Sequence, residues 1–173
     1  PKLEKNNLHI WPRGTHMLMA LANTDNSFTL TLYLPRTNHK WSFDSIKTKE
    51  RVHELFSSEF KDTLDLIPQL ESQFLENPQG SLGTVRFSEW HFNDSIALMG
   101  DAAHAIVPFF GQGMNCGFED ISQLLEILKS NQWNFETSFK HYSQQRIKNA
   151  NAIADMALEN FVEMSDKVGD QNF

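Results

Sequence analysis

LMGDAAHAIVPFFGQGMNCGFED, residues 98–120, decides the fold class of this chain. Two more apolar residues precede it, so Ile96–Met99 is predicted to be a short buried strand that ends at Gly100-Asp101. The Asp101 carboxylate would then stand at the carboxyl end of a strand, where open α/β sheets bind their ligands. We predict that Asp101 accepts hydrogen bonds from the hydroxyl groups of a sugar-like ligand, although the same spacing also suits a residue that caps a turn.

Three glycines follow an apolar loop in this stretch, at Gly111, Gly113 and Gly117. They allow the backbone to approach a ligand closely. Phe118–Leu128 then carries apolar residues at helical spacing behind an acidic first turn, so we predict a helix that begins just after the glycines. The N–H groups and the positive dipole end at its N-terminus favour an electron-rich ligand edge, and no phosphate is required.

The composition is that of a globular chain, with 173 residues of which 40% are hydrophobic and 12% aromatic. Fifteen basic and 22 acidic residues give a formal net charge of −7, which disfavours nucleic acid and anionic membrane surfaces as partners. No uninterrupted apolar run of about 18 residues occurs, so no membrane span is predicted within this sequence. The single cysteine, Cys116, fits a reducing compartment, and we interpret it as a small residue packed at a helix start rather than as a nucleophile.

Three strands are predicted near the start of the chain, at Leu8–Trp11, Thr15–Ala22 and Phe28–Leu34. A polar turn at residues 23–27 joins the last two, which favours an antiparallel meander. Apolar and polar side chains alternate along the third strand. The sheet should therefore have one apolar face and one amphipathic face that is suited to lining a pocket.

Helices are predicted at Lys49–Phe60 and Leu64–Phe74, the second interrupted by Pro68. Asn-Pro-Gln-Gly at residues 77–80 marks a break, and Thr84–Phe87 is expected to form a further short strand.

The last part of the sequence predicts one long helix or two helices in series. Apolar or amphipathic residues recur there every three or four positions: Phe135, Phe139, Tyr142, Arg146, Ala150, Ile153, Ala157, Phe161, Met164 and Val168. Asn160 falls on the same stripe and Glu163 follows three residues later, and a polar pair in this position needs a partner. A buried amide bonded to backbone and a surface carboxylate are the plain alternative.

Residues 98–120 resemble the second flavin-contacting motif of the class A flavoprotein monooxygenases, Gly-Asp-Ala-Ala-His-x-x-x-Pro followed by Gly-x-Gly-x-Asn. The matching residues are Gly100–His104 through Pro108 and then Gly111–Asn115. The variant VPFFGQGMN, with LHIWPR at residues 8–13 and ENFVEM at residues 159–164, is similar to the members of that family that hydroxylate L-kynurenine. The similarity runs along nearly the whole chain.

This resemblance implies an α/β fold with a substrate-side antiparallel sheet, the flavin motif and carboxyl-terminal helices. It divides the chain into substrate-side sheet and helices at 1–80, flavin-side strands, loop and helix at 81–130, and a helical region at 131–173. No strand followed by Gly-x-Gly-x-x-Gly occurs in the sequence. The Rossmann βαβ unit that holds the rest of the dinucleotide is therefore expected in an amino-terminal half of the same protein that is absent from this chain.

The implied reaction is the NADPH- and FAD-dependent hydroxylation of L-kynurenine to 3-hydroxykynurenine with O2, through a flavin C4a-hydroperoxide. The flavin carries the chemistry, so neither a catalytic acid or base nor a metal is expected. Family members are attached to the cytosolic face of the mitochondrial outer membrane by a carboxyl-terminal segment, which implies that location here without any support in residues 1–173. The metal alternative, His104 with Asp101, lacks a third ligand, so we interpret His104 as a packed or hydrogen-bonded histidine.

The resemblance also implies site residues, by position. Asn160 is expected to hold the amino-acid end of the substrate, and the apolar loop around Phe109 to face the reactive side of the flavin and exclude water, although that loop would also serve as ordinary core. The expected cofactor contacts are Asp101, Pro108, Gly111, Gly113, Met114 and Asn115. The expected substrate contacts are Asn160, Glu163, Met164, Phe109, Gln112, Leu8, Met19, Leu21 and Tyr33.

Two other functions remain open at this point. One is hydroxylation of a different phenolic or carboxylated aromatic by the same class of enzyme. The other is a non-catalytic binding module on a flavoprotein fold. The complete Gly-Asp and Gly-x-Gly-x-Asn set argues against the second, because a binding module has no need to contact flavin.

Overall fold

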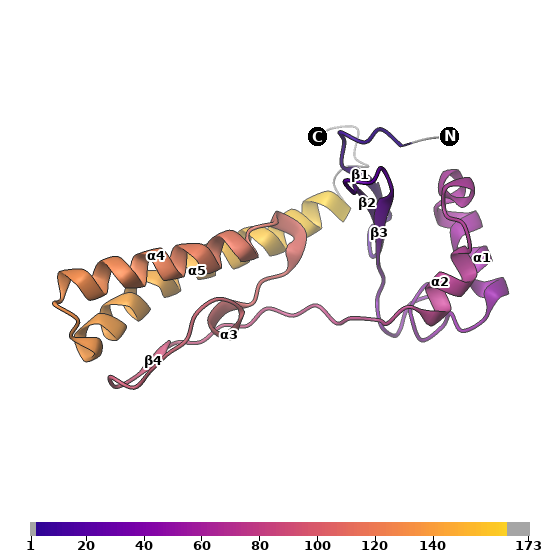
Figure 1. Ribbon diagram of the computed structural model, residues 1–173. Helices are drawn as coiled ribbons and strands as arrows, with labels where there is room; N and C mark the ends of the chain where they lie inside the picture. The colour runs from indigo at the N-terminus through magenta and orange to yellow at the C-terminus, as the bar shows by residue number, and fades with distance from the viewer. Residues whose placement is uncertain (1–2, 166–173) are drawn as a thin grey trace. The chain divides into compact units, whose positions relative to one another are not determined.

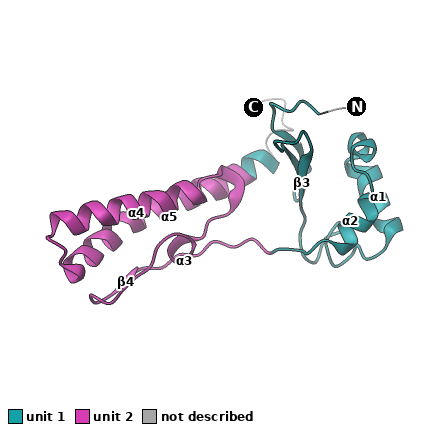
Figure 2. Cartoon of the chain, in the orientation of Figure 1, with its two compact units in different colours: residues 1–80, 162–173 teal, residues 81–161 magenta. Residues whose placement is uncertain are grey.

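Residues 3–165 are described in the computed structural model of the chain (Figure 1). The architecture is mixed α/β with small antiparallel sheets, and it divides into two compact units (Figure 2). Unit 1 comprises residues 1–80 with residues 162–173, and unit 2 comprises residues 81–161. The predicted α/β class is confirmed, whereas the functional division at residues 80 and 130 stays a prediction.

Unit 1 contains the predicted antiparallel meander, formed by β1 (His9–Pro12), β2 (Met17–Ala22) and β3 (Phe28–Tyr33) in that order. Leu18 on β2 lies directly opposite Leu32 on β3. Residues paired in this way point to the same face of a sheet, so these leucines mark the core face. The alternation along β3 thus decides which face is buried, as the sequence predicts.

The core of unit 1 forms where this face meets α1 (Lys49–Glu59). Thr48 caps the helix, because its hydroxyl oxygen accepts a hydrogen bond from the backbone N–H of Arg51 at 3.4 Å. Leu30, Leu32 and Leu34 pack against the buried cluster. That cluster consists of Leu18, Trp41, Ile46, Val52, Leu55, Phe56, Phe60 and Leu70.

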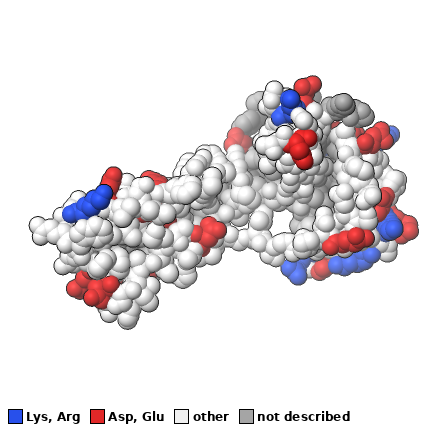
Figure 3. All heavy atoms as spheres, in the orientation of Figure 1, with Lys and Arg blue, Asp and Glu red and all other residues white. Residues whose placement is uncertain are grey.

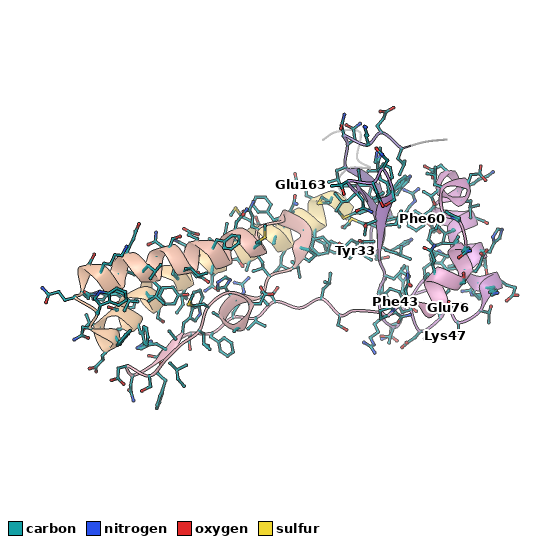
Figure 4. All side chains as sticks on the ribbon, in the orientation of Figure 1. Tyr33, Phe43, Lys47, Phe60, Glu76 and Glu163 are labelled. Atoms are coloured by element: carbon teal, nitrogen blue, oxygen red, sulfur yellow. The ribbon has the colours of Figure 1, made fainter. Side chains whose placement is uncertain are left out.

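Pro68 interrupts the second helical stretch, as predicted. The residues before it form the 3-10 helix η1 (Lys61–Leu66), and the chain resumes as α2 (Leu70–Glu76). Charged side chains of both signs gather near Lys47 and Glu76 on the face shown in Figures 3 and 4. Such a mixed, exposed surface is typical of solvated protein and indicates no charged ligand.

Unit 2 places a small hairpin and two turns against a pair of packed helices. The hairpin pairs β4 (His91–Phe92) with β5 (Ile96–Ala97), and the first turn is α3 (Asp101–His104). The helices are α4 (Gly113–Ser130) and α5 (Phe135–Ser165). Their core consists of Trp90, Ala103, Leu124, Leu128, Tyr142 and Ala150.

Two predicted strands need correction. Thr84–Phe87 is not a strand, since a single backbone hydrogen bond joins it to the other described residues, from Val85 N–H to Ala105 O at 2.8 Å. The segment Ile96–Met99 is a strand only at its first two residues, and Ile96 is 53% exposed rather than buried. A buried parallel strand needs a neighbour on each side, and residues 3–165 supply a single antiparallel partner.

The helix after the glycines begins earlier than predicted. α4 starts at Gly113 and includes Gly117, so Glu119-Asp120 falls beyond its first turn. Gly117 lies inside the helix, and a Cβ atom there would stand 3.9 Å from the Cα of Gly100, an ordinary van der Waals distance, so space at this position does not require glycine. Gly111 does need its conformational freedom, with φ of 65° at the end of the 3-10 turn η2 (Pro108–Phe110).

The carboxyl-terminal region is one continuous helix, α5, through Ser165, rather than two in series. Val168, the last position of the predicted stripe, lies outside the described residues. Within residues 3–165, no helix combines the length and the apolar character needed to cross a membrane.

One exposed stripe of α4 is apolar. It consists of Met114, Phe118, Ile121 and Leu125, which recur at helical spacing along one side. An apolar stripe of this kind normally contacts another surface. Within unit 2, the described residues leave it uncovered.

Candidate cofactor site

The Gly100-Asp101 turn presents an exposed carboxylate. Gly100 has φ of 55° and ψ of −143°, a conformation that favours glycine, and its carbonyl oxygen accepts the N–H groups of Ala103 and His104 at 2.9 Å. Asp101 is the first residue of α3 and its side chain is exposed. A turn rather than a buried strand therefore presents the Asp101 carboxylate, and its contact with a ligand stays a prediction.

A second feature is the N-terminus of α4. Gln112 provides no side-chain cap, and the first intrahelical bond runs from Cys116 N–H to Gln112 O at 2.9 Å. The N–H groups of Gly113, Met114 and Asn115 therefore precede the hydrogen-bonded part of the helix. Together with the helix dipole they form a positively polarised end that carries no formal charge.

The apolar loop that leads to α4 is partly core and partly surface. Val107 and Phe109 are buried, whereas Pro108 and Phe110 are exposed. The Phe109 ring lies against the Phe161 ring, with centroids 4.4 Å apart. Phe109 thus fixes the loop onto α5, and the exposed positions remain available to a ligand.

Asn160 is bonded to this loop. Its side-chain Nδ2 donates to the backbone carbonyl of Phe109 at 2.5 Å. The amide on the apolar stripe therefore has the backbone partner that its position demands. This bond brings two of the predicted substrate contacts together, and Gln112 lies in the same loop, where its Oε1 accepts from Asn115 Nδ2 at 2.9 Å.

The remaining predicted substrate contacts belong to unit 1. Met19, Leu21 and Tyr33 share the sheet face opposite the core face, since Met19 and Leu21 alternate with buried Leu18 and Ala20. Leu8 and Leu21 are exposed. Tyr33 is partly buried, and this burial raises the pKa of its hydroxyl group above the usual value. Glu163 is exposed and Met164 half-buried at the end of α5, where Figure 4 labels Glu163.

Behind the turn lies a charged network that the sequence analysis missed. Asp120 on α4 is fully buried, and its Oδ2 accepts from the Gly100 N–H at 2.8 Å and lies 2.5 Å from His104 Nε2. Its Oδ1 accepts from Arg146 Nε on α5 at 2.8 Å. Arg146, also buried, donates from Nη2 to the Cys116 carbonyl at 3.3 Å and forms an ion pair with Glu119.

The electrostatics of this network favour the ionised carboxylate. Burial acts to raise the pKa of Asp120, but hydrogen bonds from His104, Gly100 and Arg146 outweigh it and hold that pKa below its usual range. His104 is the hydrogen-bonded histidine that we expected, and no group of three or more metal-ligating side chains occurs in the described part of the chain. Cys116 is packed near the helix start, and burial raises its pKa.

Residues 6–157 match a protein family described as the FAD-binding domain. The chain belongs to this FAD-binding family. The match covers the meander, the Gly100-Asp101 turn and most of α5, so the family resemblance inferred from the sequence is confirmed.

Curated relatives of this FAD-binding chain carry one name. Kynurenine 3-monooxygenase from Flavobacterium johnsoniae is 46% identical over 172 residues, which are 99% of this chain and 38% of that protein. The proteins of the same name from Myxococcus xanthus and Dictyostelium discoideum are 49% and 44% identical, with 99% of this chain covered in each case and 37% and 40% of those proteins. The chain thus spans about two fifths of the length of these relatives.

Solved structures share the fold at low identity. Klebsiella pneumoniae HpxO complexed with FAD and uric acid matches 96% of this chain and 43% of its own, with a TM-score of 0.66 and 14% identity. Pseudomonas aeruginosa PqsL in complex with 2-aminobenzoylacetate matches 93% of this chain and 44% of its own, with a TM-score of 0.59 and 18% identity. These likenesses establish the fold of the FAD-binding chain.

The donor set of the site suits the flavin end of FAD. The α4 N-terminus offers uncharged N–H donors, and Asp101 offers an acceptor for hydroxyl groups. A flavin has a polar edge that becomes electron-rich on reduction and a ribityl chain that carries hydroxyl groups. The residues present therefore fit that part of the cofactor.

Proposed function

We propose that this chain is part of a longer FAD-dependent monooxygenase that hydroxylates L-kynurenine to 3-hydroxykynurenine, with NADPH as reductant and O2 as co-substrate. The observation that carries the proposal is the exposed α4 N-terminus beside the Asp101 turn, in a chain that aligns over 99% of its length with proteins named kynurenine 3-monooxygenase. The apolar stripe of α4 supports a longer protein, because that stripe needs a covering surface.

Bound flavin would supply the electron transfer from NADPH and the activation of O2. The chain's own residues bind and shield it. The N–H groups of Gly113, Met114 and Asn115 stabilise the polar edge of the flavin, and Asp101 accepts hydrogen bonds from its hydroxyl groups. Pro108 and Gly111 shape the backbone beside it.

The loop at Phe109 keeps water from the reacting face, since its ring is locked against Phe161 and its backbone against Asn160. Water exclusion protects an oxygenated cofactor from losing its oxygen as hydrogen peroxide. The kynurenine ring already carries an electron-donating amino group, so positioning matters more than a strong base.

We assign the amino-acid end of the substrate to Asn160, with Glu163 and Met164 on the same helix. We assign its aromatic ring to Leu8, Met19, Leu21 and Tyr33 on unit 1 and to Phe109 and Gln112 in the loop. A mitochondrial outer-membrane location applies only to a source that has mitochondria, and two of the relatives are bacterial.

The test uses the full-length protein that contains this chain. We expect yellow flavin absorbance to copurify with it, and NADPH to bleach that absorbance faster when L-kynurenine is added. The 3-hydroxykynurenine formed should match the NADPH consumed. If a phenol or a carboxylated aromatic accelerates this bleaching and kynurenine does not, the proposed substrate is wrong but the class of enzyme is right. Protein free of flavin, and unable to take it up, would refute the proposal and favour a binding module.

A further inference from the structure

We propose that Asp120 is a positioning residue for the flavin contact at Asp101. Its carboxylate holds the turn of residues 100–104 against α4, so that Asp101 and the α4 N-terminus keep a fixed separation. The inference rests on the proposed function, because FAD is the ligand that both features would contact.

A single oxygen atom of Asp120 holds both ends of the turn. Oδ2 accepts from the Gly100 N–H at 2.8 Å, just before α3, and lies 2.5 Å from His104 Nε2, at the last residue of α3. Asp101 lies between these two points. It cannot move relative to α4 unless one of the two bonds breaks.

The other oxygen is fixed from α5. Arg146 Nε donates to Oδ1 at 2.8 Å, and Trp90 stacks on His104 with centroids 4.9 Å apart. Three donors therefore reach Asp120, all from within unit 2, and its side chain is fully buried. Asp120 has no exposed atom with which to touch a ligand, so an effect on FAD has to pass through the residues that it holds.

Gly100 makes the position of the turn depend on these contacts. It has φ of 55° and a Cβ atom there would meet nothing within 4 Å, so conformation rather than space calls for glycine. Because glycine is the least conformationally restricted residue, a turn that begins at a glycine keeps one position only when its surroundings fix it. A buried ion pair alone is weak evidence for a contribution to stability, and the two bonds that converge on the turn suggest the more specific role.

A double-mutant cycle tests the inference in the full-length protein. The FAD dissociation constant is measured by flavin fluorescence for Asp101→Ala, Asp120→Asn and the double variant. We expect each single change to weaken FAD binding by about tenfold or more, and the double variant to bind no more weakly than Asp101→Ala. Once the Asp101 carboxylate is gone, its position no longer matters. If the loss of FAD affinity in the double variant equals the product of the losses in the two single variants, the inference is wrong.

Unfolding of the apoprotein provides the structural control. Ser138→Ala removes another side-chain bond of unit 2, the one that buried Ser138 Oγ accepts from Asn131 Nδ2 at 3.3 Å beside the connection between α4 and α5. We expect Ser138→Ala to lower stability and leave FAD affinity unchanged. If it lowers FAD affinity as much as Asp120→Asn does at equal loss of stability, Asp120 is only a core residue.

A second pair of variants keeps the test decisive if Asp120→Asn does not fold. His104→Gln retains an N–H donor for Oδ2, whereas His104→Leu removes it. We expect the glutamine variant to keep FAD affinity and the leucine variant to lose it, and equal affinities would overturn the inference. If the parent protein binds no FAD, both the proposed function and this inference are wrong. If the parent binds FAD but the losses of affinity in the single variants multiply in the double variant, the inference alone is wrong.

Discussion

Replacement of Asn160 by aspartate should loosen the loop at Phe109 through a single bond. Asn160 Nδ2 donates to the Phe109 carbonyl at 2.5 Å, and the side chain is half-buried. Asn160→Ala removes a neutral bond worth about 1 kcal/mol. Asn160→Asp removes the donor and also sets a carboxylate oxygen against the carbonyl oxygen, which should bring the total cost to about 2 kcal/mol at this partly solvated site.

Acidification should reverse the order of stability of the two Asn160 variants. In Asn160→Asp the new carboxyl group can donate to Phe109 O only when it is protonated, so folding raises its pKa above the usual value of about 3.9. The stability gained from this bond is fully present below the unfolded-state pKa and is lost as the pH rises through the higher folded-state pKa. Asn160→Asp should therefore be less stable than Asn160→Ala at neutral pH and should gain on it toward about pH 4.

Chemical unfolding of both variants and the parent, followed across that pH range, measures these differences, and kynurenine affinity and flavin content are measured in parallel. If Asn160→Asp equals Asn160→Ala in stability at every pH, the bond to Phe109 is absent in solution and the reasoning is wrong. If kynurenine binds the aspartate variant as tightly as the parent, the substrate carboxylate is held elsewhere.

Three further predictions concern the loop, the cofactor turn and unit 1. Phe109→Ala should raise the hydrogen peroxide released per NADPH consumed more than it slows NADPH oxidation, and an unchanged hydroxylation yield would remove the loop from water exclusion. Asp101→Ala should weaken FAD binding by about 10- to 150-fold while the thermal unfolding temperature stays near that of the parent, and full flavin occupancy after dialysis would make Asp101 a structural cap. Burial lowers the pKa of His16 more than the nearby Glu59 raises it, so its contribution to stability is present above the ordinary value of 6.5 and is lost as the pH falls through the lower folded-state pKa. The pH dependence of unfolding should flatten in His16→Gln, and an identical profile would exclude His16 as its source.

Local patterns predicted the elements that depend on local rules. The alternation of β3 and the effect of Pro68 depend on residues close in sequence, and both are present in the structure. The strand at Thr84–Phe87 failed because a strand requires a partner that its own sequence does not specify. The helix start moved to Gly113 for a related reason: Gly117 looked like part of a loop, but it lies inside the helix and close to Gly100, a neighbour that is distant in the sequence.

The sequence pointed to the Gly100-Asp101 turn but not to the network behind it. Asp101 stands out because of the motif around it, whereas Asp120 and Arg146 are separated by 26 residues and meet only through the packing of α4 and α5. One signal was present in the sequence. Asp120 falls on the buried side of α4 with Cys116, Leu124 and Leu128, and a charge on such a stripe calls for an opposite charge on the helix that packs against it.

The burial of Cys116 bears on the resistance to oxidation of the oxygen-using enzyme proposed above. A thiol with a raised pKa is almost entirely protonated at neutral pH, and the protonated form reacts slowly with peroxide. Met114, two residues earlier, is 72% exposed at the α4 N-terminus. Where the apolar stripe of α4 is uncovered, oxidation by peroxide should therefore fall first on the Met114 thioether, as a reversible sulfoxide, while the buried Cys116 thiol stays reduced.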